Sequence, residues 1–312
     1  MDILRKKKLE ILKKQSDYYG AQYSGLPSSL IAYFLAKQVN KTTNDLLWLA
    51  IVGLTSFYME GKIDKEIYKA QVEDLKVDVL KSKTDDREIG SIMEELDFHF
   101  PLLRHWSLYE SMLYSPYIVV KMGLWNENGI LILKEFLTSI GISLEEARQL
   151  YKYMSRDSRA RLKNDMYGKM DKLNMPDLIF SSFARKIDTD LTLTSSDMSC
   201  VISAILESPE KENATYEEVQ SKRRQNFLDA YEILFTVGTS TKRVMGYIDQ
   251  YKNFMKVLTT EAISAIERDS IPSVDFNYIK IKNDSKDKQV FEHPYSLIRL
   301  GGTVLSIYHV HH

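Results

Sequence analysis

Residues whose types could do chemistry are few in this chain, and they are scattered. The sequence Gly61-Lys62-Ile63 resembles part of a phosphate-binding loop. It lacks the upstream glycine and the hydroxyl residue that would meet magnesium, so we expect no nucleotide phosphates there. A dinucleotide glycine fingerprint and a His-Glu-x-x-His pair are also missing from the sequence.

Candidate metal ligands and nucleophiles lie in settings that favour ordinary structural roles. Asp85-Asp86 stands in a charged stretch with no histidine nearby, which indicates a solvated loop. Cys200 lies in an apolar helical pattern. We expect it to be a small buried side chain, because a reactive thiol needs a cationic or partly exposed setting. On a strand, His309 and His311 would share one face and offer a metal-binding pair. A frayed or artificially added chain end is the other interpretation.

His105 stands directly before Trp106 and shortly before a helix start signal. A hydrogen-bonded histidine at a helix start is the expected role, and a ligand or base is the alternative. We therefore predict no catalytic residues, no cofactor-binding residues, no metal ligands and no cofactor.

Three basic clusters are the remaining candidates for a binding function. They could contact a nucleic-acid backbone or an acidic partner, or they could be solvated helix faces. None interleaves aromatic residues at a spacing that makes a base-stacking platform. The clusters are Lys6, Lys7, Lys8, Lys13 and Lys14; Arg156, Arg159 and Arg161; and Lys222, Arg223 and Arg224.

Composition sets the limits on function. The 312 residues are 44% hydrophobic and 27% charged, which supports a real core, and the formal net charge is −1. Any nucleic-acid contact must therefore come from a local patch. The single cysteine fits a reducing compartment. No apolar run reaches the roughly 20 residues that span a bilayer, so we expect an intracellular protein without a membrane segment.

The element that organises the rest is a helix predicted over Asn44–Thr55. Apolar residues fill nearly every position, and a helix that is apolar on all sides must be surrounded by other elements. Thr43 or Asn44 can cap its first free backbone N–H groups. Gly53 costs roughly 1 kcal/mol against alanine inside a helix, and we expect a neighbouring backbone to approach closely there.

The rest of the chain also reads as mainly α. Ser107 with Glu110, and Ser143 with Glu146, have the spacing of capping boxes. Helices are further expected after Asn126, after Ser155 and after Ser195 or Ser196, with two long helices between Tyr216 and Arg268. A short extended segment is expected within 93–103, and 178–186 is expected to be a strand or an ordered connector. Alternation over Phe276–Lys282 predicts the start of a sheet.

These patterns divide the chain into four parts. They are a basic amphipathic helix and linker (1–27), a helical body (28–210), long connecting helices (211–270), and a small, incomplete α/β subdomain (271–312).

Several blocks of the sequence resemble one family. The buried helix Asn44–Thr55 and the segment His105–Ser111 are the most specific, with Asn44, Trp48, Gly53, His105 and Trp106 as signature core residues. Weaker blocks occur in the same order at Tyr18-Tyr19-Gly20, Leu124-Trp125, Lys134–Leu137 and Leu206–Lys211. Together they resemble the cell division control protein 45 family, eukaryotic replication factors related to RecJ-type DHH phosphoesterases.

The resemblance implies a fold and a function. It implies that 28–210 is the family's helical inter-domain region and that 271–312 belongs to its DHH-associated subdomain. The family's N-terminal DHH domain has no counterpart here, so the chain resembles a central fragment. The implied function is a non-catalytic scaffold in the nucleus that joins the MCM helicase ring and the GINS complex. Weak contact with single-stranded DNA is possible, and no membrane or small-molecule substrate is implied.

Two other functions stay open at this stage. A DHH-type metal-dependent phosphoesterase acting on single-stranded DNA would need an Asp-His-His triplet, which is missing. A helical adaptor unrelated to replication would make the ordered matches coincidental. Gly301-Gly302 could correspond to a phosphate-facing motif of active relatives, but Thr303 follows with no nearby Gly-His sequence.

Overall fold

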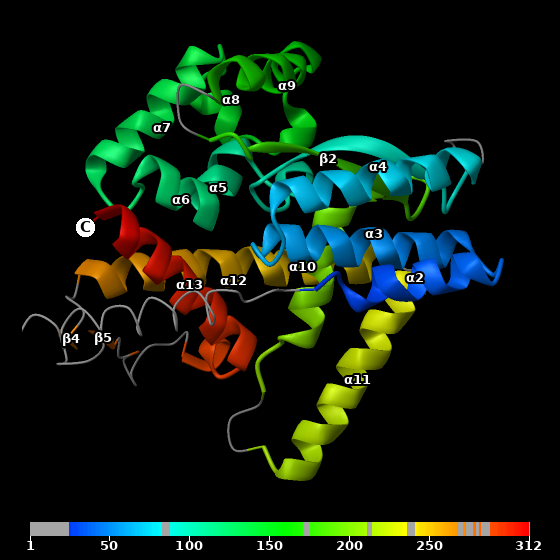
Figure 1. Ribbon diagram of the computed structural model, residues 1–312. Coiled ribbons are helices and arrows are strands. Elements are labelled where there is room, and N and C mark those ends of the chain that lie inside the picture. Colours follow the sequence, from blue (N-terminus) through cyan, green and yellow to red (C-terminus); the bar gives the residue numbers. More distant parts are fainter. Residues whose placement is uncertain are drawn as a thin grey trace, which may run out of the picture.

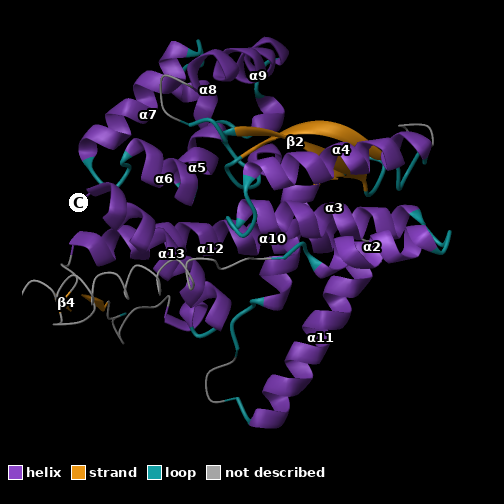
Figure 2. Ribbon diagram, in the orientation of Figure 1, coloured by secondary structure: helices purple, strands orange, loops and turns teal. Residues whose placement is uncertain are grey.

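Helix α3 (Asn44–Met59) runs through the middle of the fold, between α2 (Ser28–Gln38), α4 (Lys65–Lys81) and α10 (Ser195–Leu206) (Figure 1). The computed structural model describes residues 25–82, 88–170, 175–210, 214–235, 241–267, 271–272, 277–278, 281 and 288–311. Helices dominate these residues (Figure 2), so the predicted mainly α class is confirmed.

The sequence explains why α3 is central. The hydroxyl of Thr43 accepts from the backbone N–H of Leu46 and caps the helix. Eight of its side chains are buried, on all sides of the helix, and Trp48 has no exposed surface. The predicted buried helix is therefore confirmed, and its N-cap is Thr43.

A three-stranded antiparallel sheet lies against α4 and α10. Strand β1 (Ile92–Phe98) pairs with β2 (Ile179–Lys186) from Ile92 opposite Arg185 to Phe98 opposite Ile179. The short strand β3 (Thr192–Thr194) pairs with the end of β2. Both expected extended segments are confirmed as strands.

Between β1 and β2 the chain folds into a lobe of short helices at the top of Figure 1. The elements are η1 (Leu103–His105), α5 (Leu108–Leu113), α6 (Pro116–Met122), α7 (Glu127–Ser139), α8 (Leu144–Arg148), η2 (Tyr151–Tyr153) and α9 (Arg156–Met170). Ser107, Asn126, Ser143 and Ser155 each accept the backbone N–H of the third residue after them, as predicted. The two predicted capping boxes form only in this half, because the Glu110 carboxylate accepts from the Ser107 hydroxyl and the Glu146 carboxylate accepts from the Ser155 N–H.

The start of α10 differs from the prediction. The N-cap is Thr194, and neither Ser195 nor Ser196 serves as the cap. The Thr194 hydroxyl accepts from the Asp197 backbone N–H at 3.2 Å, and the Asp197 carboxylate accepts from the Thr194 N–H at 3.4 Å. This reciprocal pair satisfies two backbone N–H donors that would otherwise be unpaired. A cap at Ser195 or Ser196 could not satisfy two donors in this way with the residues that follow it.

Two long helices follow, as expected: α11 (Tyr216–Phe235), which packs on α10 and α3, and α12 (Thr241–Glu267), which packs on α10. Arg185 of β2 joins several of these elements. Its buried guanidinium donates to Asp45 at the start of α3, to the Gly90 carbonyl before β1, and to the Leu234 carbonyl at the end of α11, at 2.5, 3.3 and 3.5 Å.

Beyond residue 270 the described residues are mostly helical. They form two-residue strands β4 (Ile271–Pro272) and β5 (Asn277–Tyr278), the turn η3 (Lys288–Phe291) and α13 (Pro294–His311), which packs on α12 and α6. Most of the expected strand at 276–282 lies outside the described residues. The segment that carries His309 and His311 is helical, so the strand that would align them does not form.

The close approach expected at Gly53 comes from α2. A Cβ atom built on Gly53 would lie 2.1 Å from Oγ and 3.3 Å from Cβ of Ser29. The neighbour is therefore a side chain at the start of α2, and not backbone as the sequence led us to expect. A glycine lets α2 and α3 pack together here.

We predict that Gly53→Ala lowers the free energy of unfolding by about 1–3 kcal/mol, because the added methyl group overlaps the Ser29 side chain at the start of α2, which has to rotate and shift. In a Ser29→Ala background the cost should fall clearly, since the hydroxyl that blocks the methyl group is gone. Urea unfolding of the four proteins in this double-mutant cycle measures both effects.

Gly246 supplies the control. It lies in α12 with nothing within 4 Å of a built Cβ, so Gly246→Ala should leave stability unchanged or raise it by up to about 1 kcal/mol. If Gly53→Ala behaved like Gly246→Ala, the proposed crowding between α2 and α3 would be wrong.

Candidate functional site

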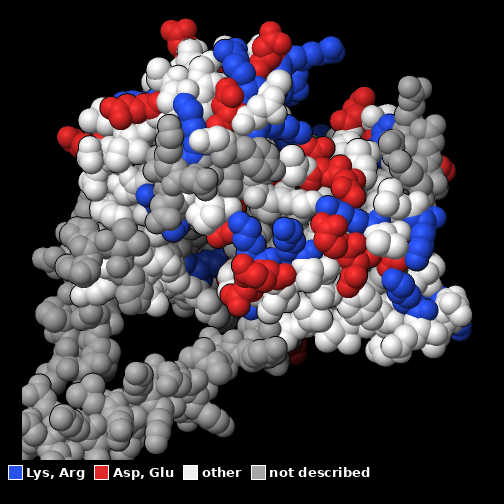
Figure 3. All heavy atoms as spheres, turned by 45° about the horizontal axis from the view of Figure 1, so that its top comes forward, with Lys and Arg blue, Asp and Glu red and all other residues white. Residues whose placement is uncertain are grey.

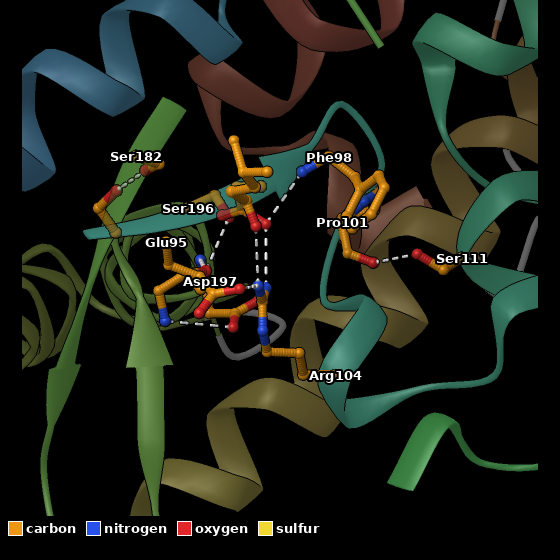
Figure 4. Close-up of polar contacts among 12 residues, drawn as sticks. Glu95, Phe98, Pro101, Arg104, Ser111, Ser182, Ser196 and Asp197 are labelled. Atoms are coloured by element: carbon orange, nitrogen blue, oxygen red, sulfur yellow. Dashed lines mark hydrogen bonds and ion pairs between the residues drawn. The ribbon is translucent and has the colours of Figure 1, made fainter. Parts of the chain in front are cut away.

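The most concentrated group of polar side chains is a buried junction between the sheet, η1 and α10 (Figure 4). Asp97, near the end of β1, is 3% exposed. Its carboxylate accepts from Arg104 Nη1 and from the Phe98 backbone N–H, both at 3.0 Å, and from the Ser196 hydroxyl. Because a buried carboxylate without partners is costly, these three donors fix where β1 ends relative to α10.

Arg104 links this carboxylate to a second acidic group. Its Nη2 donates to Glu95 Oε1 at 3.2 Å and to the Leu96 carbonyl at 3.1 Å. Glu95 in turn accepts from Lys163 of α9 at 2.8 Å. Burial disfavours the charged guanidinium, yet Asp97, Asp197 and Glu95 raise the pKa of Arg104 above its ordinary value. The cation is therefore held in place by several acids at once.

Asp197 is the other buried acid of the junction. Burial alone would raise its pKa, but the nearby His105 ring, the Arg104 guanidinium and Thr194 together hold the pKa below its ordinary value. His105 Nε2 lies 3.6 Å from Asp197 Oδ2 and makes no hydrogen bond with the described residues, so the hydrogen bond expected for this histidine does not form at Nε2. The carboxylate is thus charged at neutral pH, and its role is to hold the start of α10 against η1.

A chain of hydroxyl groups extends the junction toward α3. The Ser195 hydroxyl lies 2.8 Å from that of Thr55 and 2.7 Å from that of Ser182, and all three residues are buried. One hydroxyl of α10 is thus joined to α3 on one side and to β2 on the other. These groups pair with one another and leave little hydrogen-bonding capacity for a ligand.

The segment 105–111 attaches this junction to the rest of the body. Trp106 stacks on Tyr114 at 5.7 Å, and Lys256 of α12 lies 5.5 Å from the Trp106 ring. Lys256 also pairs with Glu110 at 3.2 Å, and Ser111 donates to the Pro101 carbonyl at 2.6 Å. The side chains of this segment therefore tie η1 and α5 to α10 and α12.

The basic residues singled out in the sequence that the structure describes lie on two separate helices, α9 and α11. Lys6, Lys7, Lys8, Lys13 and Lys14 lie outside the described residues. On α9, Arg156 is exposed, Arg159 lies 5.9 Å from the Tyr151 ring, and Arg161 donates to Ser158. Figure 3 shows cations and acids interspersed over the face that it displays.

The cluster on α11 is divided by its contacts. Lys222 donates to the Pro209 carbonyl, and Arg223 pairs with Glu210 at 2.7 Å. Both side chains hold the segment that precedes α11. Arg224 is exposed and makes no ion pair within the described part of the chain. Three cations that are adjacent in sequence therefore have two different roles.

The other candidate positions fall in structural settings. Cys200 is buried on α10, and burial raises the pKa of its thiol well above the ordinary value. Gly61 lies in the turn after α3 with a positive φ. Asp85-Asp86 lies outside the described residues. Among the residues that are described, no group of three or more His, Cys, Asp or Glu is placed to hold a metal ion, and no helix is long and apolar enough to span a bilayer.

Sequence reasoning missed Asp97, Arg104 and Asp197. Asp197 carries a signal, because Thr194 and Asp197 have the spacing of a capping box. Asp97 and Arg104 carry none, since their pairing depends on how β1 and the following turn fold.

The fold and this junction define a mainly helical body whose buried polar groups bind one another. The family description CDC45 matches residues 2–311, so the chain belongs to the CDC45 family.

Similar proteins support this assignment. The cell division control protein 45 homolog of Schizosaccharomyces pombe is 30% identical over 331 residues, which cover 95% of this chain and 51% of that protein. The homolog of Dictyostelium discoideum is 28% identical and covers 89% and 48%. The crystal structure of CDC45 from Entamoeba histolytica has a similar fold, with a TM-score of 0.73 at 21% identity, covering 90% of this chain and 55% of that one. The chain spans about half the length of the curated relatives it matches.

We predict that Asp197→Asn lowers the free energy of unfolding at pH 7, because the Arg104 and His105 side chains lose a charged partner. The folded-state pKa of Asp197 is depressed, so its contribution is present above the unfolded value of about 4 and is lost as pH falls below it. The difference in the free energy of unfolding between wild type and variant should therefore shrink as the pH falls below about 4. Urea unfolding across this range measures it, and a difference independent of pH would contradict the assignment.

Proposed function

We propose that the chain acts as a non-catalytic DNA replication factor that joins the MCM helicase ring and the GINS complex in the nucleus. The observation that carries the proposal is the match to the CDC45 family over residues 2–311, combined with the resemblance of the two signature segments to that family. The organisation of the junction supports a structural role, because its polar groups are used in holding elements together.

A scaffold of this kind works by binding one state of its partner better than another. A rigid body that contacts both MCM and GINS favours the ring conformation in which both contacts are made. Stable assemblies of this type bury about 2,000 Å² or more across their partners. Ser195 bonds to α3 and β2, and the adjacent Ser196 bonds to Asp97 of β1, so the start of α10 is held on several sides, which favours the rigidity that such a surface needs.

We predict that the purified chain binds MCM, GINS or both, and that the free energy of binding depends on an intact body. Gly53→Ala, which opens the contact between α2 and α3, should weaken binding, whereas Gly246→Ala should not. Co-purification followed by titration calorimetry measures this. A wild-type chain that binds neither partner would overturn the proposal, and cleavage of labelled single strands with manganese would favour a phosphoesterase.

Weak contact with single-stranded DNA is a secondary part of the proposal, and α9 is its best described location. Arg156 and Arg159 are three residues apart and share one helix face. Replacing both with alanine should weaken binding and reduce the slope of log affinity against log salt by roughly 0.7 for each phosphate that is no longer neutralised. Lys222→Ala with Arg223→Ala is the matched control, since these cations already hold Pro209 and Glu210. Equal weakening by both pairs of substitutions would exclude a specific role for α9.

A further inference from the structure

Helix α11 has two apolar faces, and the fold uses one of them. Ala230 and Ile233 are buried on the side that packs against α10 and α3. Phe227, Leu228 and Tyr231 are 62%, 48% and 54% exposed. In Figure 1, α11 leaves the body below α2 and α3. A helix that is apolar on two sides needs a second neighbour.

The exposed side chains form a regular stripe. Arg224, Phe227, Leu228 and Tyr231 have the spacing i, i+3, i+4 and i+7, and we call these four residues the outer seam. Tyr231 also contacts Phe235, with ring centroids 4.5 Å apart. This spacing is the one by which a helix presents anchors to another helix. Arg, Tyr and large apolar residues of this kind carry much of the binding energy at protein interfaces.

The charge on the outer seam defines the partner's chemistry. Arg224 is exposed and has no ion pair within the described residues. Glu232, beside the seam, is held by Arg243 of α12 at 2.8 Å, and Asp229, farther around the helix, is held by the same arginine at 2.6 Å. The seam therefore presents one cation beside three apolar anchors, and a partner that covers Arg224 has to supply a carboxylate opposite it.

A second copy of the chain fits this requirement poorly. If two α11 helices packed antiparallel through Phe227, Leu228 and Tyr231, each Arg224 would face the apolar end of the other helix near Phe235. The carboxylates between these positions are those already held by Arg243. A buried cation without a partner carries a large cost, so self-pairing is disfavoured.

We propose that the outer seam of α11 docks an amphipathic helix that carries a Glu or Asp opposite Arg224 and belongs to another protein of the assembly. This inference rests on the proposed function, because it names the surface through which the scaffold holds MCM or GINS. The apolar anchors supply most of the affinity, and the Arg224 pair sets the register of the incoming helix.

The test uses the full chain with purified MCM ring and GINS complex. Phe227→Ser with Tyr231→Ser should weaken binding to one of them by about tenfold or more, and Arg224→Glu should weaken binding to the same partner. Arg224→Lys should retain most of the affinity. Ile298→Ser with Leu305→Ser removes two equally exposed apolar side chains from α13 and is the matched control. Unfolding midpoints should stay unchanged in every variant, because the altered side chains are exposed.

Two results separate the inference from the proposed function. If wild type and all outer-seam variants bind MCM and GINS equally, the inference is wrong and the proposed function stands. If wild type binds neither MCM nor GINS, the proposed function fails. The inference is then tested separately, by measuring whether the chain binds a pair of designed helical peptides. Both peptides carry a leucine seam, and they place Glu or Lys opposite Arg224.

The peptide with Glu should bind tighter to wild type, and Arg224→Glu should reverse the order. Equal binding of both peptides, or no binding, would overturn the inference. Sedimentation of the chain alone completes the test. A concentration-dependent dimer that disappears in Phe227→Ser with Tyr231→Ser would show that a second copy, and not another protein, occupies the outer seam.

Discussion

Two buried acids share one cation in this fold, and the surrounding elements are arranged around that constraint. Asp97 and Asp197 come from a strand and a helix far apart in sequence, and Arg104 lies between them. Neither carboxylate can be buried at low cost without the guanidinium and the hydroxyl groups nearby. The end of β1, the turn η1 and the start of α10 therefore have to meet at one point. The segment 105–111 begins at that point, with His105 beside Asp197 and with Trp106 and Glu110 against Lys256 of α12.

The sequence predicted local structure well wherever a cap and an apolar pattern agreed. The helices after Thr43, Ser107, Asn126 and Ser143 begin where their caps predict. The start of α10 was misplaced by one or two residues because Thr194, Ser195 and Ser196 are all good caps, and the choice depends on Asp197. The Arg104 contacts could not be predicted, since they require the positions of β1 and α10. The Gly53 contact was half predicted: the close approach was expected, but its source in Ser29 depends on tertiary packing.

Basic residues that are adjacent in the sequence do not necessarily form one surface in the fold. On α11, consecutive residues are rotated by about 100°, so Lys222, Arg223 and Arg224 point in three directions. Two of them stabilise the preceding segment, and the third lies beside Phe227 and Tyr231. A small net charge with ordered local pairs favours selective protein contacts over bulk binding of polyanions.

Arg185 gives the fold a mechanical property. Its guanidinium holds the last turn of α11, the first turn of α3 and the loop before β1 at once. At the other end of α11, Lys222 and Arg223 anchor the incoming chain. The last turns of α11, where Ala230 and Ile233 are also buried against the body, are therefore joined to the sheet and to the central helix. Moving that end of α11 would disturb the first turn of α3 and the loop before β1 at the same time.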